Sequence, residues 1–261
     1  HRCCRRQRQM CIRDSLPNHP DTLFALVNSL LEAGYRWLLV QEHSVEQLDG
    51  SPLSSQQRFV PNRLVARSCS GEEVSITALI KTQGSDTKLV GQMQPCEEAF
   101  GLSRQRLGNV EIPSLVSQIA DGENGGVMMN EFPEAFRQAN RRIRDSKPDT
   151  AALNGSEYLE QLDALGLKTS DLPRIQAVHQ HRLWQKAGES GDLESVARSI
   201  DELSSANDGF SMEGASWTNN LSWVEGYDNV LQPMQRFSAS FHQQFDHCLL
   251  YTSDAADDNT C

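Results

Sequence analysis

A helix, a tight turn and a buried strand follow one another in the run DTLFALVNSLLEAGYRWLLVQEH, residues 21–43, and this unit constrains the fold most. Apolar side chains recur at helical spacing in its first half, at Leu23, Leu26, Val27, Leu30 and Leu31. Pro20 and Asp21 suit the start of a helix, and Gly34 suits its stop. We therefore expect an amphipathic helix that buries one face.

The strand that follows this helix is short and apolar. Residues 37–40 read WLLV, and the polar residues Gln41, Glu42 and His43 end the run. A strand that is apolar on both faces and follows a covering helix is typical of a parallel sheet. The sequence therefore predicts an α/β fold with polar side chains at the end of this strand.

Two further strands are predicted at NRLVARS, residues 62–68, and EVSITALIK, residues 73–81. A Ser-Gly-Glu turn joins them, so they read as a hairpin. A simple alternating β/α barrel does not need a hairpin, and we expect an insertion at this point of the chain. Lys81 stands at the end of the second strand.

After residue 130 the pattern becomes mostly helical. Four segments carry apolar residues three and four apart, with Asp, Ser or Pro near their starts: 134–145, 156–166, 171–187 and 192–205. We expect residues 131–247 to form a helical region that packs on a β/α part covering residues 16–130.

Both ends of the chain resemble the two strands of one transposon-type sequencing adapter, each translated in frame. The stretches are RRQRQMCIRDS and CLLYTSDAADD. Such adapters carry a variable DNA index, and codons can be chosen for residues 2–4 that supply one. The reverse complement of this index supplies the codons of Asn259 and Thr260. We therefore expect residues 1–15 and 248–261 to be adapter-derived tails that flank a fragment and add no strand to its sheet.

The composition excludes several classes of protein. The tails hold five of the seven cysteines, so the cysteine count indicates neither disulfides nor a metal site and is compatible with a cytoplasmic location. The formal net charge of −11 argues against a nucleic-acid partner. No apolar run reaches the ~18 residues of a membrane span, so we expect no membrane partner.

The stretch SLVSQIADGENGGVMMNEFP, residues 114–133, raises the sharpest functional question. Leu115, Val116 and Ile119 predict a strand, and Asp121 and Glu123 follow at the point where that strand would stop. Barrel enzymes keep their catalytic residues at such strand ends. On spacing alone, Asp-Gly-Glu-Asn-Gly-Gly is also typical of a loop in which the aspartate caps a turn and the glycines take positive φ.

The segment IADGENGG resembles the fourth conserved region of glycoside hydrolase family 57. The resemblance extends over almost all of residues 16–247 and includes GYRWLLVQEH, LIKTQGSDTKLVGQMQP and SWTNN. It implies an incomplete (β/α)7 barrel followed by a helical region. It also implies a retaining hydrolase or glucanotransferase that acts on α-glucans, of the amylase, branching-enzyme or 4-α-glucanotransferase type, with no cofactor.

Carried onto this sequence, the resemblance makes Asp121 the general acid/base, and Glu123 and Asn124 substrate-binding or orienting groups. Retaining chemistry needs a second carboxyl group roughly 5 Å away, which attacks the sugar. The family's nucleophilic glutamate precedes a helix and strand like those of residues 20–40, so its expected position falls within the first tail or before it. We therefore expect the chain as written to be inactive.

Five other residues are predicted to contact the substrate: Glu42, His43, Lys81, Trp217 and Trp223. The first three stand at the ends of predicted strands, where they either line a cleft or make structural hydrogen bonds. The two tryptophans stand among asparagines, which suits stacking on sugar faces, or else they pack in the core.

Two rival functions remain open. A polysaccharide deacetylase on a related barrel needs metal ligands, and residues 16–247 contain no His-x-x-x-His pair. His179 and His181 lie two apart on a predicted helix and face different directions, so we expect no metal. A noncatalytic glucan-binding or regulatory protein would keep the barrel without turnover. The pattern indicates no particular oligomeric state.

Overall fold

The computed structural model describes residues 10–11, 16–81, 89–117, 132–145, 150–188, 192–206 and 209–212, together with short helical pieces at 232–234, 236–237 and 239–240. The chain divides into two compact units, His1–Trp217 and Thr218–Cys261. The described part of the second unit consists of those helical pieces alone. The account below concerns the first unit.

The predicted helix–turn–strand unit is confirmed. Helix α1 (Pro20–Glu32) begins with proline in its first turn and buries Leu23, Val27 and Leu30. Gly34 follows the helix with φ +81°, a conformation that only glycine adopts without strain. Strand β2 (Trp37–Gln41) is buried along its whole length, as a strand covered on both faces requires.

A six-stranded mixed sheet forms the centre of the unit, in the order β1-β2-β5-β4-β8-β3. Its strands are β1 (Met10–Cys11), β2, β3 (Val45–Gln47), β4 (Asn62–Arg67), β5 (Glu73–Lys81) and β8 (Arg174–Ala177). The parallel pairs are β1–β2, β2–β5 and β4–β8, whereas β4–β5 and β3–β8 are antiparallel. The predicted α/β class and the predicted hairpin of residues 62–81 are both confirmed.

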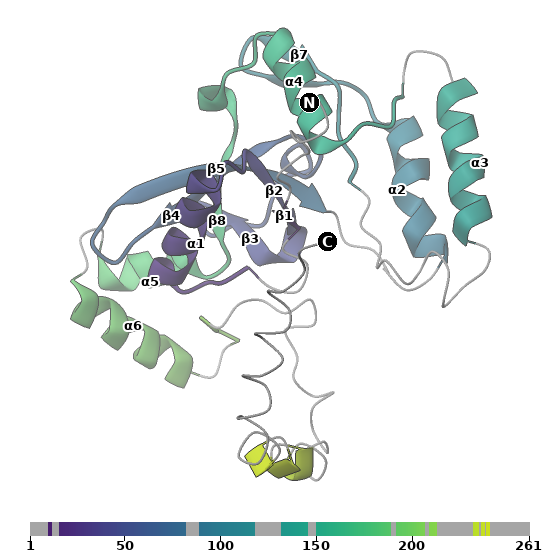
Figure 1. Ribbon diagram of the computed structural model, residues 1–261. Helices are drawn as coiled ribbons and strands as arrows, with labels where there is room; N and C mark the ends of the chain where they lie inside the picture. Colours follow the sequence, from purple (N-terminus) through teal and green to yellow (C-terminus); the bar gives the residue numbers. More distant parts are fainter. Residues whose placement is uncertain are drawn as a thin grey trace, which may run out of the picture. The chain divides into compact units, whose positions relative to one another are not determined.

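One face of the sheet packs against α1 (Figure 1). Alternate residues of five strands enter the same core as the apolar face of the helix: Leu38, Val40, Val45, Leu64, Ala66, Ile76, Ala78, Ile80, Ile175 and Ala177. The turn after β4 is also tied to the helix, because the Cys69 amide donates to Asp21 Oδ1 at 2.7 Å. Burial, and then the neighbouring Asp21, raise the pKa of the Cys69 thiol to about 12.

The sheet must be strongly curved. The 3-10 turn η1 (Glu42–Ser44) is the whole connection between β2 and β3, yet three strands lie between those two in the sheet. In a flat sheet the four strand spacings would place β2 and β3 ~19 Å apart. The chain from Gln41 to Val45 reaches at most ~14 Å. A flat sheet is therefore excluded by chain length alone.

Further elements flank the sheet. They are η2 (Gln57–Phe59), α2 (Leu89–Gly101), the hairpin β6 (Gln105–Leu107) and β7 (Val110–Ile112), α3 (Phe132–Asp145), α4 (Gly155–Ala164), η4 (Thr169–Asp171), α5 (Gln180–Ala187) and α6 (Leu193–Ser205). Helices α2 and α3 lie side by side, joined by an ion pair in which Arg142 Nη2 is 3.2 Å from Glu97 Oε2 (Figure 1). The predicted helices at 134–145, 156–166 and 192–205 are confirmed.

Two sequence-based expectations are wrong. Residues 171–187 were expected to be one helix, but residues 174–177 form β8 and α5 begins only at Gln180. The structure thus places a strand of the central sheet inside the segment expected to be wholly helical. The first tail was also expected to add no strand, yet Met10–Cys11 pair with β2. The open edge of β2 offers unpaired backbone groups that any extended chain can bind.

Within the part of the chain that the structure describes, no helix is both long and apolar enough to cross a membrane.

The indole of Trp37 lies directly beneath the first turn of α4. Its Nε1 donates to Ser156 Oγ at 3.1 Å, and a Cβ added at Gly155 would lie 2.4 Å from its Cζ2. Gly155→Ala is therefore expected to lower the free energy of unfolding by about 1–3 kcal/mol, the usual cost of overpacking. Urea unfolding followed by fluorescence measures it. Gly101→Ala is the control, because a Cβ there meets nothing within 4 Å; equal losses in both variants would contradict the argument.

Candidate functional site

The strongest candidate site lies at the carboxyl ends of the adjacent parallel strands β2 and β5. Gln41 and Lys81 are register partners at these ends, and their exposed fractions are only 5% and 6%. Ligands of open α/β sheets bind outside the carboxyl ends of parallel strands, as do the substrates of barrels. Lys81, predicted as a substrate contact, thus lies at the expected edge of the sheet.

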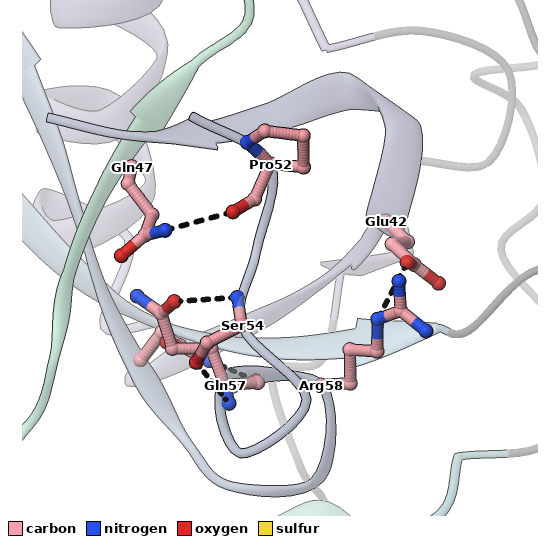
Figure 2. Close-up of polar contacts among 7 residues, drawn as sticks. Glu42, Gln47, Pro52, Ser54, Gln57 and Arg58 are labelled. Carbon is pink, nitrogen blue, oxygen red and sulfur yellow. Dashed lines mark hydrogen bonds and ion pairs between the residues drawn. The ribbon is translucent and has the colours of Figure 1, made fainter. Parts of the chain in front are cut away.

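Glu42 follows at once after β2 and is held by an ion pair. Its Oε1 lies 2.8 Å from Arg58 Nε, and Figure 2 shows the two side chains facing one another across the loop. The loop itself is fixed by reciprocal bonds between Ser54 and Gln57, and by Gln47 Nε2, which donates to Pro52 O at 2.8 Å. The Glu42 carboxylate is therefore held in place, and Arg58 balances its charge. This contact agrees with the alternative in which Glu42 makes structural hydrogen bonds.

His43 is the titratable group of this edge. Burial, and then the positive charge of Lys81, lower the pKa of His43 below its usual value, while the carboxylate of Glu42 opposes that shift. Among the described residues, none hydrogen-bonds the buried Nε2 of this ring. An imidazole nitrogen can accept or donate one hydrogen bond, depending on its protonation.

The chain that leads to the Asp-Gly-Glu motif reaches this same edge. Ser117 Oγ donates to the carbonyl oxygen of Ile80 at 2.7 Å, one residue before Lys81. The Leu115 amide donates to Phe59 O at 2.8 Å. Residues 113–117 have no strand assignment, so the strand predicted from Leu115 and Val116 is wrong over its described part. Single hydrogen bonds, rather than a ladder, carry this segment to the end of β5.

The motif itself lies outside the described residues, as do both tryptophans. This applies to Asp121, Glu123, Asn124, Trp217 and Trp223. Their predicted roles stay predictions. Of the predicted site, the structure brings together Glu42, His43 and Lys81, which come from η1 and from β5.

The sheet face that points away from α1 is polar over much of its area. Side chains alternate along a strand, so residues two apart share a face. The residues that alternate with the apolar core set are Gln41 of β2; Glu73, Ser75, Thr77 and Lys81 of β5; Arg63 and Arg67 of β4; Arg174 and Gln176 of β8; and Glu46 of β3. Trp37, Leu39, Val65 and Leu79 form the apolar part of this face, and α4 and the β6–β7 hairpin cover Trp37, Leu39 and Leu79.

Glu46 is a buried carboxylate that sequence reasoning missed. Its exposed fraction is 6%, and it accepts hydrogen bonds from Gln176 Nε2 at 2.9 Å and from the amides of His179 and His181 at 3.0 and 2.8 Å. A carboxylate at the start of α5 matches the positive end of the helix dipole. Nothing in the pattern Val-Glu-Gln distinguishes such a residue from a surface glutamate.

His179 and His181 have separate surroundings. His179 precedes α5 with φ +74°, and its ring packs 5.3 Å from the ring of Phe210. His181 Nδ1 lies 3.1 Å from the carbonyl oxygen of Leu48. Within the described ranges, no three His, Cys, Asp or Glu side chains are grouped in a way that could hold a metal ion.

Comparison with protein-family models, curated proteins and solved structures found no match, so the resemblance to glycoside hydrolase family 57 stays a prediction.

The effect of Lys81 on His43 can be measured. Lys81→Met removes the positive charge that helps to lower the pKa of His43, so that pKa is expected to rise. A proton NMR titration of the imidazole C–H signals measures the shift. Lys186→Met is a matched control, since Lys186 pairs with Glu202 on α5 and α6 at 2.7 Å. An unchanged His43 pKa in Lys81→Met would show that the two groups do not interact.

Proposed function

We propose that this chain carries the acid/base side of the active site of a retaining hydrolase or glucanotransferase that acts on α-glucans. Asp121 is the general acid/base in this proposal, and Glu123 and Asn124 orient the substrate. The sheet and its flanking helices form part of an incomplete (β/α)7 barrel. Trp217 and Trp223 are proposed to stack on sugar rings.

The single observation that carries the proposal is the hydrogen bond from Ser117 to Ile80. Asp121 follows Ser117 by four positions, and four steps of chain span at most ~14 Å. In the proposal the Asp121 carboxylate acts at the carboxyl end of β5, which lies within this reach and where Lys81 and His43 also lie. Catalytic residues of barrel enzymes gather at this end of the strands.

Two features of the sheet support the barrel. The short link between β2 and β3 requires strong curvature, and closure of a barrel is the limiting case of curvature. The division of faces supports it as well, because α1 covers an apolar face while the opposite face carries charged and hydroxyl side chains. A polar inner face is what a barrel that binds saccharides needs.

The acid/base role makes a demand on the surroundings of Asp121. A carboxyl group that protonates a leaving oxygen near neutral pH needs a pKa above its usual value, which partial burial or a nearby anion supplies. Glu123 offers the anion. Lys81 lowers the pKa of His43 and Glu42 opposes that shift, so both charges act on the imidazole beside the proposed site.

The test is Asp121→Asn in a version of the protein that extends upstream of Leu16 and includes the family's nucleophilic glutamate. Turnover of amylose is expected to fall by roughly 10²–10⁴-fold, the usual contribution of general acid/base catalysis. A maltosyl substrate with an activated aryl leaving group needs no protonation, so its first cleavage step should be far less affected. Steady-state and burst kinetics on both substrates measure this difference.

Asp163→Asn is the matched control, because Asp163 is an exposed partner of Arg36. Near-normal amylose turnover in Asp121→Asn would overturn the assignment. Equal losses on both substrates would indicate a structural role for Asp121. Maltooligosaccharide binding without any turnover in the extended protein would favour the noncatalytic glucan-binding alternative.

A further inference from the structure

The polar sheet face holds a local excess of positive charge in a chain of net charge −11. Its middle part carries Arg63 and Arg67 from β4 and Arg174 from β8, against the single carboxylate of Glu73 from β5. Glu46, farther along the same face, is occupied by Gln176 and by the start of α5. The described charges around Arg63 therefore do not balance.

Arg63 stands between a hydroxyl and a second arginine. Its register partners are Thr77 on β5 and Arg174 on β8. Like charges on directly opposite residues of neighbouring strands are unfavourable. The Nε of Arg63 is buried, and within the described part of the chain it has no hydrogen-bond partner. A buried guanidinium N–H without an acceptor is costly, so an acceptor that reaches Arg63 stabilises this part of the sheet.

The other groups of this patch are already engaged. Arg174 Nη2 donates to both carboxylate oxygens of Glu73, at 2.7 and 2.8 Å. The guanidinium of Arg67 lies 5.4 Å from the ring centroid of Trp184, in a cation–π contact. The carboxylate of Glu73 is thus held by Arg174, and Arg63 is left beside Thr77, which is partly buried.

We propose that Arg63, Thr77 and Arg174 form a binding site for the phosphate group of a phosphorylated saccharide. A guanidinium fork binds two oxygens of such a group, and a hydroxyl supplies a further donor. A phosphate group compensates Arg63, which makes no ion pair among the described residues, and lies next to the exposed side chain of Arg174. The phosphate site stands on the charges of this face alone, whereas the saccharide that carries the phosphate rests on the proposed function.

The position of this site along β5 requires an extended ligand that passes around Leu79, which α4 and the β6–β7 hairpin bury between Thr77 and Lys81. Thr77 and Lys81 share one face of the strand and are four residues apart, which corresponds to ~13 Å. A phosphate at Arg63 and a sugar ring at the carboxyl end of β5 therefore belong to one ligand only if it contains more than one sugar. The proposed ligand is accordingly a phosphorylated oligosaccharide rather than a phosphorylated monosaccharide bound at the catalytic edge.

Binding by the full chain is measured by isothermal titration calorimetry with three probes: inorganic phosphate, maltotriose, and a maltooligosaccharide that carries a phosphate ester. Arg63→Gln is expected to weaken binding of the phosphate ester about tenfold or more, the effect of losing a charge-assisted hydrogen bond. Thr77→Val should weaken it several-fold and keeps a β-branched residue in the strand. Arg36→Gln, which removes an exposed arginine outside the sheet face, should leave it unchanged.

The outcomes separate the two parts of the proposal. Loss of phosphate-ester binding in Arg63→Gln, with maltotriose binding retained, supports the site. Inorganic phosphate could also bind as tightly as the ester and depend on Arg63 in the same way. That result supports the anion site and contradicts the proposal that its ligand is a saccharide. Equal weakening by Arg63→Gln and Arg36→Gln, or no phosphate binding by the unaltered chain, overturns the site. Circular dichroism checks that each variant is folded. If Arg63→Gln is unfolded, unchanged binding of the phosphate ester by Thr77→Val overturns the proposed site.

None of these outcomes depends on turnover. Failure of Asp121→Asn to reduce amylose cleavage would remove the proposed reaction and leave the phosphate site intact. Absence of phosphate binding would remove the site and leave the proposed reaction intact.

Discussion

The length of the link between β2 and β3 constrains the whole sheet. Only Glu42–Ser44 connect these strands, although β5, β4 and β8 lie between them. The sheet has to bend until its two sides approach within the reach of this link. One result is that Glu42 and His43 lie at the join, close to the end of β5. The buried carboxylate of Glu46 reinforces the same region, because it holds β3 to β8 and to the start of α5.

The curvature gives the two sheet faces different environments. One face is filled by α1 and contributes apolar side chains from five strands. The other face receives side chains of opposite parity, and these are mostly charged or carry hydroxyl groups. Alternation along a strand is sufficient to separate the face that α1 covers from the polar face at which we propose binding, since neighbouring residues point in opposite directions. Stability and recognition can therefore be assigned to different residues of the same strands.

The sequence predicted those elements whose period is long or whose boundaries are marked. Helix α1 has five apolar residues at helical spacing and a terminal glycine, and the β4–β5 hairpin has two alternating runs around a turn. Strand β8 was missed because its four residues lie between helical patterns and match either period. A strand was predicted from Leu115, Val116 and Ile119 because apolar residues cluster there. The described residues up to Ser117 bind the sheet through isolated hydrogen bonds, which leave no periodic pattern in the sequence.

The candidate site was predictable only in part. Polar residues that directly follow an apolar strand identified Glu42, His43 and Lys81, because strand ends are visible in the sequence. Their partners were not visible, since the contact of Glu42 with Arg58 depends on a loop, and that of Ser117 with Ile80 depends on a long-range approach. Arg63 was read only as part of a strand. Its significance arises from register, which brings Arg174 opposite it.

The raised pKa of Cys69 gives the turn between β4 and β5 a chemical property of its own. Only a thiolate reacts with alkylating reagents, and this buried thiol, whose backbone amide is bonded to Asp21, scarcely forms a thiolate near neutral pH. Alkylation at this cysteine therefore requires the turn to separate from α1. The alkylation rate of Cys69, measured by peptide mapping, therefore reports how often the structure opens locally where the hairpin meets the helix.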